Sequence, residues 1–231
     1  MIRILKSWLE IGECYNFLCR KGLPHSNIPA KNWEFYYAYT LAEHIGKTAR
    51  IIDLGCGEPY MLKLLHQANF VSLFGVDLSI SFSARLSQIH RMWRGRTLKP
   101  PFRLYKGDIC RTRFQAGAFD LALCLSVLEH GVNIERFFAE AFRILRADGR
   151  LFITVDYWKE HIDIPKACSP FGLTWHIFSD EDIRELLRIA RAQGFSLLIN
   201  EEIPIPTNKV IVWNSQEYTL LSVIFVKANK P

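Results

Sequence analysis

The sequence predicts an α/β fold: a doubly wound, mostly parallel sheet of seven strands with an antiparallel strand at the C-terminus. Short apolar runs bounded by turn residues alternate with segments of helical period, which is the order that parallel strands and crossover helices produce. The last two apolar runs, 196–203 and 218–228, have no helix-length segment between them. They are therefore expected to pair antiparallel, with the final strand inserted beside the others.

The expected elements follow one another along the chain. The helix at 178–195 has the clearest signals, because Ser179 can cap its start, Asp182 lies three residues on, and Gly194 follows its last turn. The other predicted strands lie at 49–54, 71–78, 102–108, 119–125 and 149–157, and the other predicted helices at 60–68, 81–93 and 134–146.

The first 32 residues are expected to form a helical cap on a main domain at 33–231. Apolar residues from Ile4 to Leu18 recur at helical spacing, and charges at Lys6 and Glu10 interrupt any signal-peptide core. No segment reaches the roughly 20 uncharged apolar residues of a membrane span. The six cysteines include no CxxC pair, as expected of reduced thiols. We therefore expect a cytoplasmic protein without a membrane span.

The charge of the chain leaves its partners open. The net charge is +6, and basic residues are densest at 90–103 and 111–113. Such stretches permit an anionic partner, but solvated loop surface has the same composition.

Six motifs, in a fixed order, carry a family resemblance. They read IIDLGCGEP, FGVDLS, KGDI, FDLALCLSVLEH, ILRADGRLFITV and the terminal hairpin. Through them, residues 33–228 resemble the small single-domain class I S-adenosylmethionine-dependent methyltransferases of the methyltransferase-11 kind. The resemblance implies S-adenosylmethionine as the cofactor and S-adenosylhomocysteine as its product.

The DLGCG turn is expected to hold the methionine end of the cofactor. Gly55 and Gly57 permit a tight turn and close approach of a ligand. A dinucleotide fingerprint would have a third glycine at position 60, where this chain has Tyr60, so an NAD-dependent oxidoreductase is disfavoured. The resemblance implies that Asp53 binds the cofactor amino group, with Cys56 between the two glycines. A purely structural turn is the alternative.

Two further strand ends are expected to contact the nucleoside. A carboxylate at Asp77 can accept hydrogen bonds from both ribose hydroxyls, or it can cap the following helix. Leu78 is placed to pack on the adenine. The resemblance implies that Asp108 accepts a hydrogen bond from the adenine amino group, with Ile109 against the ring. An exposed loop carboxylate is the alternative for Asp108.

The segment after the fourth strand is expected over the reaction centre, because ligands bind outside the carboxyl ends of the strands. The resemblance implies that the backbone at Leu125 and Ser126 lines the methionine moiety, and that Glu129 and His130 face the acceptor. His130 is the candidate catalytic base, since a histidine pKa of about 6.5 suits that task. A local structural role for His130 is equally open.

Two patterns are missing from this segment. Some methyltransferases of this fold bind a divalent metal through Glu-x-x-Glu-His, but Ser126 stands where the first Glu would be, so we expect no metal. Enzymes that methylate exocyclic amines of bases usually carry Asn/Asp-Pro-Pro-Tyr/Phe here, and this segment has no proline. Nucleic acid is therefore a possible partner but not the favoured one.

Two aromatic segments, 29–45 and 156–178, are expected to form the acceptor pocket. The first is an aromatic stripe at helical spacing, which is usually core, although tyrosine hydroxyls favour a boundary. The second is a long connection without clear secondary structure, which is often functional. The residues expected to bind the acceptor are Tyr36, Tyr157, Trp158, His161 and Trp175, with Trp213 joining them.

The expected function is methyl transfer to a small polar acceptor such as a metabolite, a sugar or a natural product. O-methylation is preferred, because His130 and His161 offer possible bases. The alternatives are an RNA- or protein-directed methyltransferase and a cofactor-binding subunit without turnover. The motifs carry no information on the acceptor or on the oligomeric state.

Overall fold

The computed structural model of the protein describes residues 1–80, 100–165, 168, 170–199 and 202–228. The predicted helix at 81–93 and most of the basic stretch 90–103 lie outside these residues. In chain order the elements are β1 (Ile2–Ile4), α1 (Trp8–Arg20), α2 (Pro29–Ile45), β2 (Arg50–Leu54), α3 (Tyr60–Gln67), β3 (Ser72–Asp77), β4 (Arg103–Lys106), β5 (Phe119–Leu125), α5 (Ile134–Ile144), β6 (Leu145–Tyr157), a 3-10 turn (Pro170–Gly172), α6 (Asp180–Gln193), β7 (Phe195–Leu197), β8 (Ile211–Trp213) and β9 (Gln216–Lys227).

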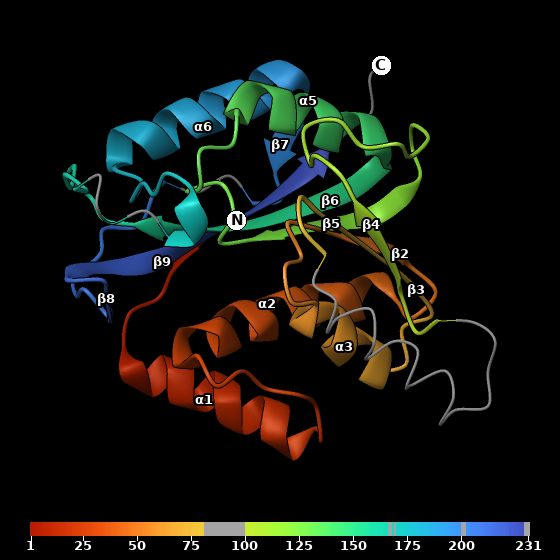
Figure 1. The fold of residues 1–231 in the computed structure, drawn as a ribbon, viewed down its shortest axis with the longest axis horizontal. Helices are drawn as coiled ribbons and strands as arrows, with labels where there is room; N and C mark the ends of the chain where they lie inside the picture. The colour runs from red at the N-terminus through yellow and green to blue at the C-terminus, as the bar shows by residue number, and fades with distance from the viewer. Residues whose placement is uncertain (81–99, 166–167, 169, 200–201, 229–231) are drawn as a thin grey trace.

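One sheet runs through the molecule, with α1, α2 and α3 on one side and α5 and α6 on the other (Figure 1). Its order is β1-β9-β6-β5-β2-β3-β4, and β7 and β8 also pair with β9. Strands β6, β5, β2, β3 and β4 run parallel to one another, whereas β9 is antiparallel to all of its partners, β6 included. The predicted doubly wound sheet with an antiparallel C-terminal strand is confirmed.

Among the described residues the sheet has nine strands, where seven were expected. The two that the sequence did not reveal are β1 and β8, which are three residues each, and a run that short carries almost no periodic signal. The first helix begins at Trp8 rather than near Ile4, because the backbone of Ile2–Ile4 pairs with β9. One strand of the expected N-terminal cap is therefore part of the main sheet.

Both faces of the central strands are buried, which explains why their sequences are almost continuously apolar. Side chains alternate between the faces along each strand. In β5, Leu121 and Leu123 pack with the α2–α3 layer, whereas Ala122 and Cys124 pack with the α5–α6 layer. This double packing holds the carboxyl ends of β2, β5 and β6 in fixed positions.

The ends of α5 and α6 show how well local signals set boundaries. The Ser179 hydroxyl accepts a hydrogen bond from the Asp182 amide in a capping box, and Gly194 ends α6 in the left-handed region at φ 103°. The predicted caps of α6 are therefore confirmed. Helix α5 ends at Ile144, and β6 begins at Leu145, four residues before the predicted strand start. In the described part of the chain, we find no helix long and apolar enough to cross a membrane.

Candidate active site

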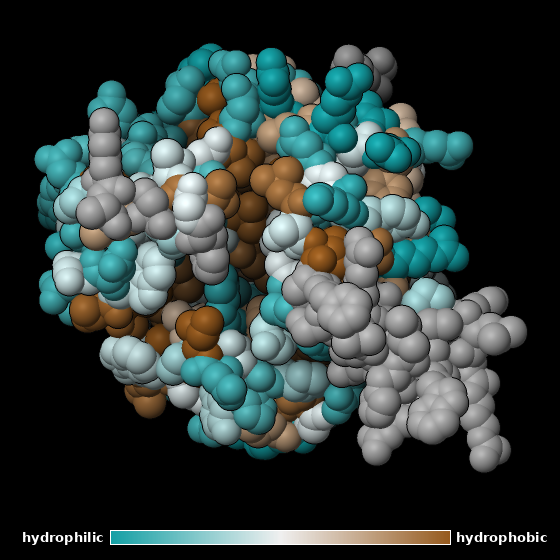
Figure 2. Space-filling model, viewed as in Figure 1, coloured by the Kyte–Doolittle hydropathy of each residue, from teal (hydrophilic) through white to brown (hydrophobic). Residues whose placement is uncertain are grey.

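A pocket of about 520 Å³ opens at the carboxyl ends of the central parallel strands. The turn after β2, the segments after β5 and β6, helix α2 and the β8–β9 hairpin all line it. Figure 2 shows a hollow near the centre of the face in view, with apolar side chains on its floor. Ligands of open α/β sheets bind at this edge, so this pocket is the candidate active site.

The glycine turn after β2 is fixed by backbone contacts. The amides of Gly55 and Cys56 both donate to the Val76 carbonyl of β3, at 2.8 and 3.2 Å. Gly55 has φ 82°, and a Cβ there would lie 2.5 Å from the Val127 side chain, so only glycine fits. Gly57 has φ 45°, but a Cβ there would meet no atom within 4 Å. The turn therefore closes against the protein at Gly55 and opens at Gly57, as close approach of a ligand requires.

Asp53 lies at the base of this turn and lines the pocket. Its residue is only 3% exposed, and burial raises the pKa of its carboxyl to about 7, an effect that nearby Lys31 opposes. A positively charged group placed beside Asp53 would favour the ionised carboxylate. The site thus fits the amino group that the resemblance assigns to Asp53.

The remaining predicted cofactor residues fall into two groups. Cys56 and Leu125 line the pocket together with Asp53 and Gly55. The other predicted cofactor residues are not among those that line the pocket. Asp77 and Asp108 form hydrogen bonds with nearby backbone amides instead. Asp77 accepts hydrogen bonds from the Gly57 and Ser79 amides at 2.8 and 2.9 Å, and Asp108 accepts one from the Cys110 amide at 2.8 Å. Leu78 is exposed, and Ile109 is buried in the core on the α5–α6 side.

Helix α2 is tied to the strand ends by a buried carboxylate, Glu34. Its Oε1 accepts hydrogen bonds from the Ser126 and Thr154 hydroxyls, and its Oε2 lies 2.8 Å from the Lys31 ammonium. Lys31 also donates to the Leu125 carbonyl at 3.4 Å. Glu34 is not among the site residues predicted from the sequence. A charged residue inside the aromatic stripe of α2 was the available signal, because charges in such a stripe must be paired.

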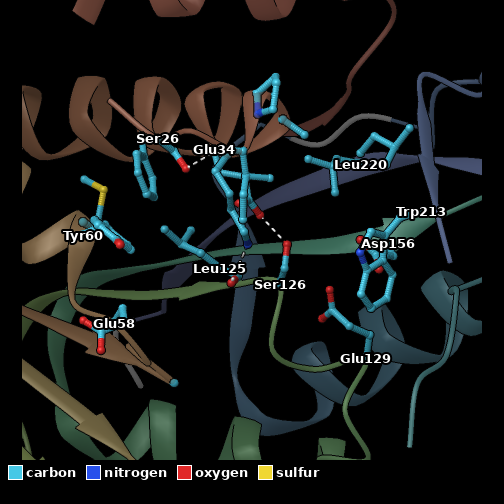
Figure 3. A pocket seen from close by; sticks show the side chains of 18 of the residues that line it. Ser26, Glu34, Glu58, Tyr60, Leu125, Ser126, Glu129, Asp156, Trp213 and Leu220 are labelled. Carbon is cyan, nitrogen blue, oxygen red and sulfur yellow. Dashed lines mark hydrogen bonds and ion pairs between the residues drawn. The ribbon is translucent and has the colours of Figure 1, made fainter. Parts of the chain in front are cut away.

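Two more buried carboxylates face the pocket, Glu129 and Asp156 (Figure 3). The Trp175 indole donates to Asp156 at 2.8 Å, and burial raises the pKa of Asp156 to about 7. Neither carboxylate oxygen of Glu129 has a hydrogen-bond partner among the described residues. Burial, and then the neighbouring Asp156, raise the pKa of Glu129 well above its ordinary value.

The candidate base His130 lines the same pocket. Its Nδ1 lies 3.4 Å from the Thr174 carbonyl oxygen, and burial lowers its pKa below the ordinary histidine value. The lowered pKa favours the neutral imidazole, which is the state that can accept a proton.

Of the five residues predicted to bind the acceptor, Trp175 is the one that lines the pocket. Its indole packs edge-on against Trp213, with ring centroids 4.8 Å apart, and Trp213 lines the pocket as expected. Tyr36 instead packs against the rings of Phe17 and Tyr37. It follows Phe35, which does line the pocket, and successive residues on a helix point in different directions.

The second aromatic segment places three predicted residues elsewhere. The buried Tyr157 hydroxyl donates to Asp180 of α6, because Tyr157 points to the opposite face of β6 from Asp156. Trp158 is half-buried with the Lys209 ammonium 5.1 Å from its ring centre. His161 lies at the surface, 3.1 Å from the carboxylate of its neighbour Asp163.

The protein-family comparison identifies the domain. Residues 52–153 match the methyltransferase domain family. Two curated proteins are similar over part of the chain: the eEF1A lysine and N-terminal methyltransferase of Danio rerio and an uncharacterized 37.1 kDa protein in transposon TN4556 of Streptomyces fradiae. The first is 24% identical over 158 residues, 64% of this chain and 22% of its own length. The second is 31% identical over 153 residues, 63% of this chain and 43% of its own length. The chain therefore spans less than half of either relative.

Solved structures share the fold. The cyclase SpnF superposes with a TM-score of 0.64 at 17% identity, over 85% of this chain and 82% of its own. Geranyl diphosphate C-methyltransferase from Streptomyces coelicolor superposes with a TM-score of 0.63 at 16% identity, over 89% and 86%.

The match of residues 52–153 to the methyltransferase domain family and the shared fold confirm the expected resemblance to the class I S-adenosylmethionine-dependent methyltransferases, a class whose cofactor is S-adenosylmethionine.

Proposed function

We propose that this protein transfers a methyl group from S-adenosylmethionine to a hydroxyl of a small polar acceptor. One observation carries the proposal: a single pocket is lined at one end by Gly55 and Cys56 of the glycine turn and elsewhere by His130, Trp175 and Trp213, which form a recess. The first part suits the cofactor, and the second suits an acceptor placed beside it.

The residues present fit the cofactor. Asp53 would hold its amino group, and the space beside Gly57 would admit its methionine end. Lys31 is the one lysine among the described pocket-lining residues, and it would offset the cofactor carboxylate. When bound, the cofactor supplies a sulfonium whose methyl group is already reactive, so the protein needs no covalent nucleophile of its own.

The protein's tasks are then positioning, exclusion of water and removal of a proton. The acceptor oxygen must be held about 3 Å from the methyl carbon, in line with the sulfur. The rings of Trp175 and Trp213 would hold its body and keep water out. The neutral imidazole of His130 would accept the hydroxyl proton.

A protein-directed methyltransferase is the second candidate. The observation that favours it is the similarity to the eEF1A lysine and N-terminal methyltransferase of Danio rerio. Binding a macromolecule would need a basic acceptor surface or an added recognition segment.

The experiment that tests the proposal has two steps. Calorimetric titration with S-adenosylhomocysteine should show binding, and Asp53→Asn should weaken it about tenfold or more, because a charge-assisted hydrogen bond is lost. The exposed Asp163→Asn is the matched control and should bind as the wild type does.

The second step is incubation with methyl-labelled S-adenosylmethionine and fractionated extract of the source cells. Label in a small molecule would support the proposal and identify the acceptor by mass. Label in protein alone would favour the second candidate, and absence of S-adenosylhomocysteine binding would overturn both.

A further inference from the structure

We propose that the methyl acceptor carries a protonated amine and that the carboxylate of Glu129 binds it. This inference rests on the proposed function and adds the chemical class of the acceptor.

The position of Glu129 is set by its backbone. It lies between β5 and α5, and its carbonyl oxygen accepts a hydrogen bond from the His176 amide at 3.0 Å. One residue on, the His130 amide donates to the Val127 carbonyl at 3.1 Å. The side chain is thereby held in the pocket wall, and Figure 3 shows its carboxylate pointing inward, toward Ser126.

Glu129 is buried, and among the described residues only its own backbone and the nearby charge of Lys31 oppose the rise of its pKa. The residue is 1% exposed, and neither oxygen of its carboxylate has a hydrogen-bond partner among the described residues. A buried carboxylate without a partner is strongly disfavoured, whereas one that meets a cation can be net stabilising. The missing partner is therefore a group that a ligand brings.

The other carboxylates that line the pocket already have partners or a cofactor role. Glu34 receives two hydroxyls and Lys31, and Asp156 receives the Trp175 indole. Asp53 is assigned to the cofactor, and Glu58 lies at the other end of the pocket with Lys63 at 4.0 Å. Among the described acids that line the pocket, Glu129 alone is therefore available to bind a positively charged group of the acceptor.

The surroundings of Glu129 also suit a cation. Trp175 packs edge-on against both Trp213 and Tyr218, with ring centroids 4.8 and 5.8 Å apart. All three rings line the pocket, and aromatic faces attract ammonium groups. The recess therefore offers a carboxylate for the ammonium group of such an acceptor and aromatic rings for its apolar body.

The recess is separate from the expected cofactor site. In Figure 3, Glu129 and Asp156 lie on the side of Trp213, whereas Glu58 and Tyr60, which follow the glycine turn, lie across the pocket with Ser126 between the two groups. The amino group of the cofactor is expected at Asp53, below the glycine turn, so it does not fill the place beside Glu129.

The test compares amines with alcohols of matched shape. Protein saturated with S-adenosylhomocysteine is titrated with benzylamine and benzyl alcohol, and with tyramine and tyrosol. Wild-type protein should bind the amine of each pair about tenfold or more tightly, the effect of one charge-assisted hydrogen bond. Glu129→Gln should reduce that preference to less than about threefold, with the alcohol and S-adenosylhomocysteine affinities unchanged. The exposed Asp163→Asn should keep the full preference.

Three results would overturn the inference. The wild type could bind amine and alcohol of both pairs equally, the preference could survive in Glu129→Gln, or Glu129→Gln could lose S-adenosylhomocysteine affinity, which would move Glu129 into the cofactor site. If Glu129→Gln does not fold, Glu129→Ala repeats the comparison without a buried amide. Because the titrations need no turnover, an absent methyl transfer would count against the proposed function alone.

Discussion

The two ends of the pocket are built by different means. The end at the glycine turn is shaped by backbone: the amides of Gly55 and Cys56 bind β3, and a missing Cβ leaves room for a ligand. The end at Glu129 is shaped by side chains that come from α2, β6, β8 and the segment after β5. A short sequence motif is enough to predict a turn of this kind. The second end forms only when segments far apart in the sequence come together in the fold.

The difference predicts how each end responds to mutation. Changes at the turn should alter folding or cofactor affinity, and changes at the recess should alter the acceptor step while leaving the cofactor bound.

The largest effect is expected at His130. His130→Gln should lower kcat by about 100- to 10,000-fold, because the acceptor hydroxyl loses its proton acceptor. Initial rates with the identified acceptor measure this, and calorimetry should give an unchanged affinity for S-adenosylhomocysteine. A loss of less than about fivefold would contradict the base role and favour an acceptor atom that needs no base.

The next largest effect separates the two glycines of the turn. Gly55→Ala should lower the free energy of unfolding by about 3 kcal/mol, because its Cβ would lie 2.5 Å from Val127 at a positive φ. Gly57→Ala, with positive φ but free space, should cost only about 1 kcal/mol and should instead weaken S-adenosylhomocysteine binding. Urea unfolding and calorimetry on both variants make the comparison. Equal losses of stability in the two variants would show that Val127 does not restrict position 55 more than position 57 is restricted.

A smaller effect should appear in the pH dependence of stability without cofactor. The pKa of Asp53 is about 7 in the folded protein and about 4 when unfolded, so the folded state binds the extra proton between these values. Its contribution is therefore complete below about pH 4 and is lost as the pH rises to about 7. We expect a loss of about 2 kcal/mol over this range, roughly half of the full shift, because water and Lys31 adapt to the new charge.

Asp53→Asn should flatten this dependence relative to the wild type, as followed by urea unfolding at a series of pH values. The same pH dependence in the wild type and in Asp53→Asn between pH 4 and pH 7 would show that folding does not raise the pKa of Asp53. Bound S-adenosylhomocysteine should make the free energy of unfolding depend less on pH, since its amino group favours the ionised Asp53 carboxylate.

The smallest expected effect compares two aromatic residues of the recess region. Trp213→Ala should raise the acceptor KM about tenfold, because an aromatic wall is lost. Tyr36→Phe should change KM by less than about twofold, because Tyr36 packs on Phe17 and Tyr37 away from the pocket. Steady-state kinetics on the two variants give the ratio. Similar KM values for both would mean that the Trp175–Trp213 pair does not contact the acceptor.

The sequence predicted the sheet well because apolar period and caps are local properties. Strand β5 has the predicted bounds, Phe119 to Leu125, and α6 has the predicted cap at Ser179. The acceptor end was harder to predict, since the direction of a side chain depends on register. Tyr157 and Asp156 are neighbours in β6, yet only Asp156 enters the pocket. Aromatic composition alone could not distinguish them.

Strand β9 has a consequence for how the chain is made. It is the antiparallel partner of β1, β6, β7 and β8, and it pairs Ile2–Ile4 with Leu221–Val223. On a ribosome Ile2–Ile4 emerge long before their partners in β9 and must wait, unpaired, until those residues follow. Such distant pairing is slow to form, so during synthesis the hydrophobic edge of β6 stays open to chaperones or to wrong partners until β9 arrives.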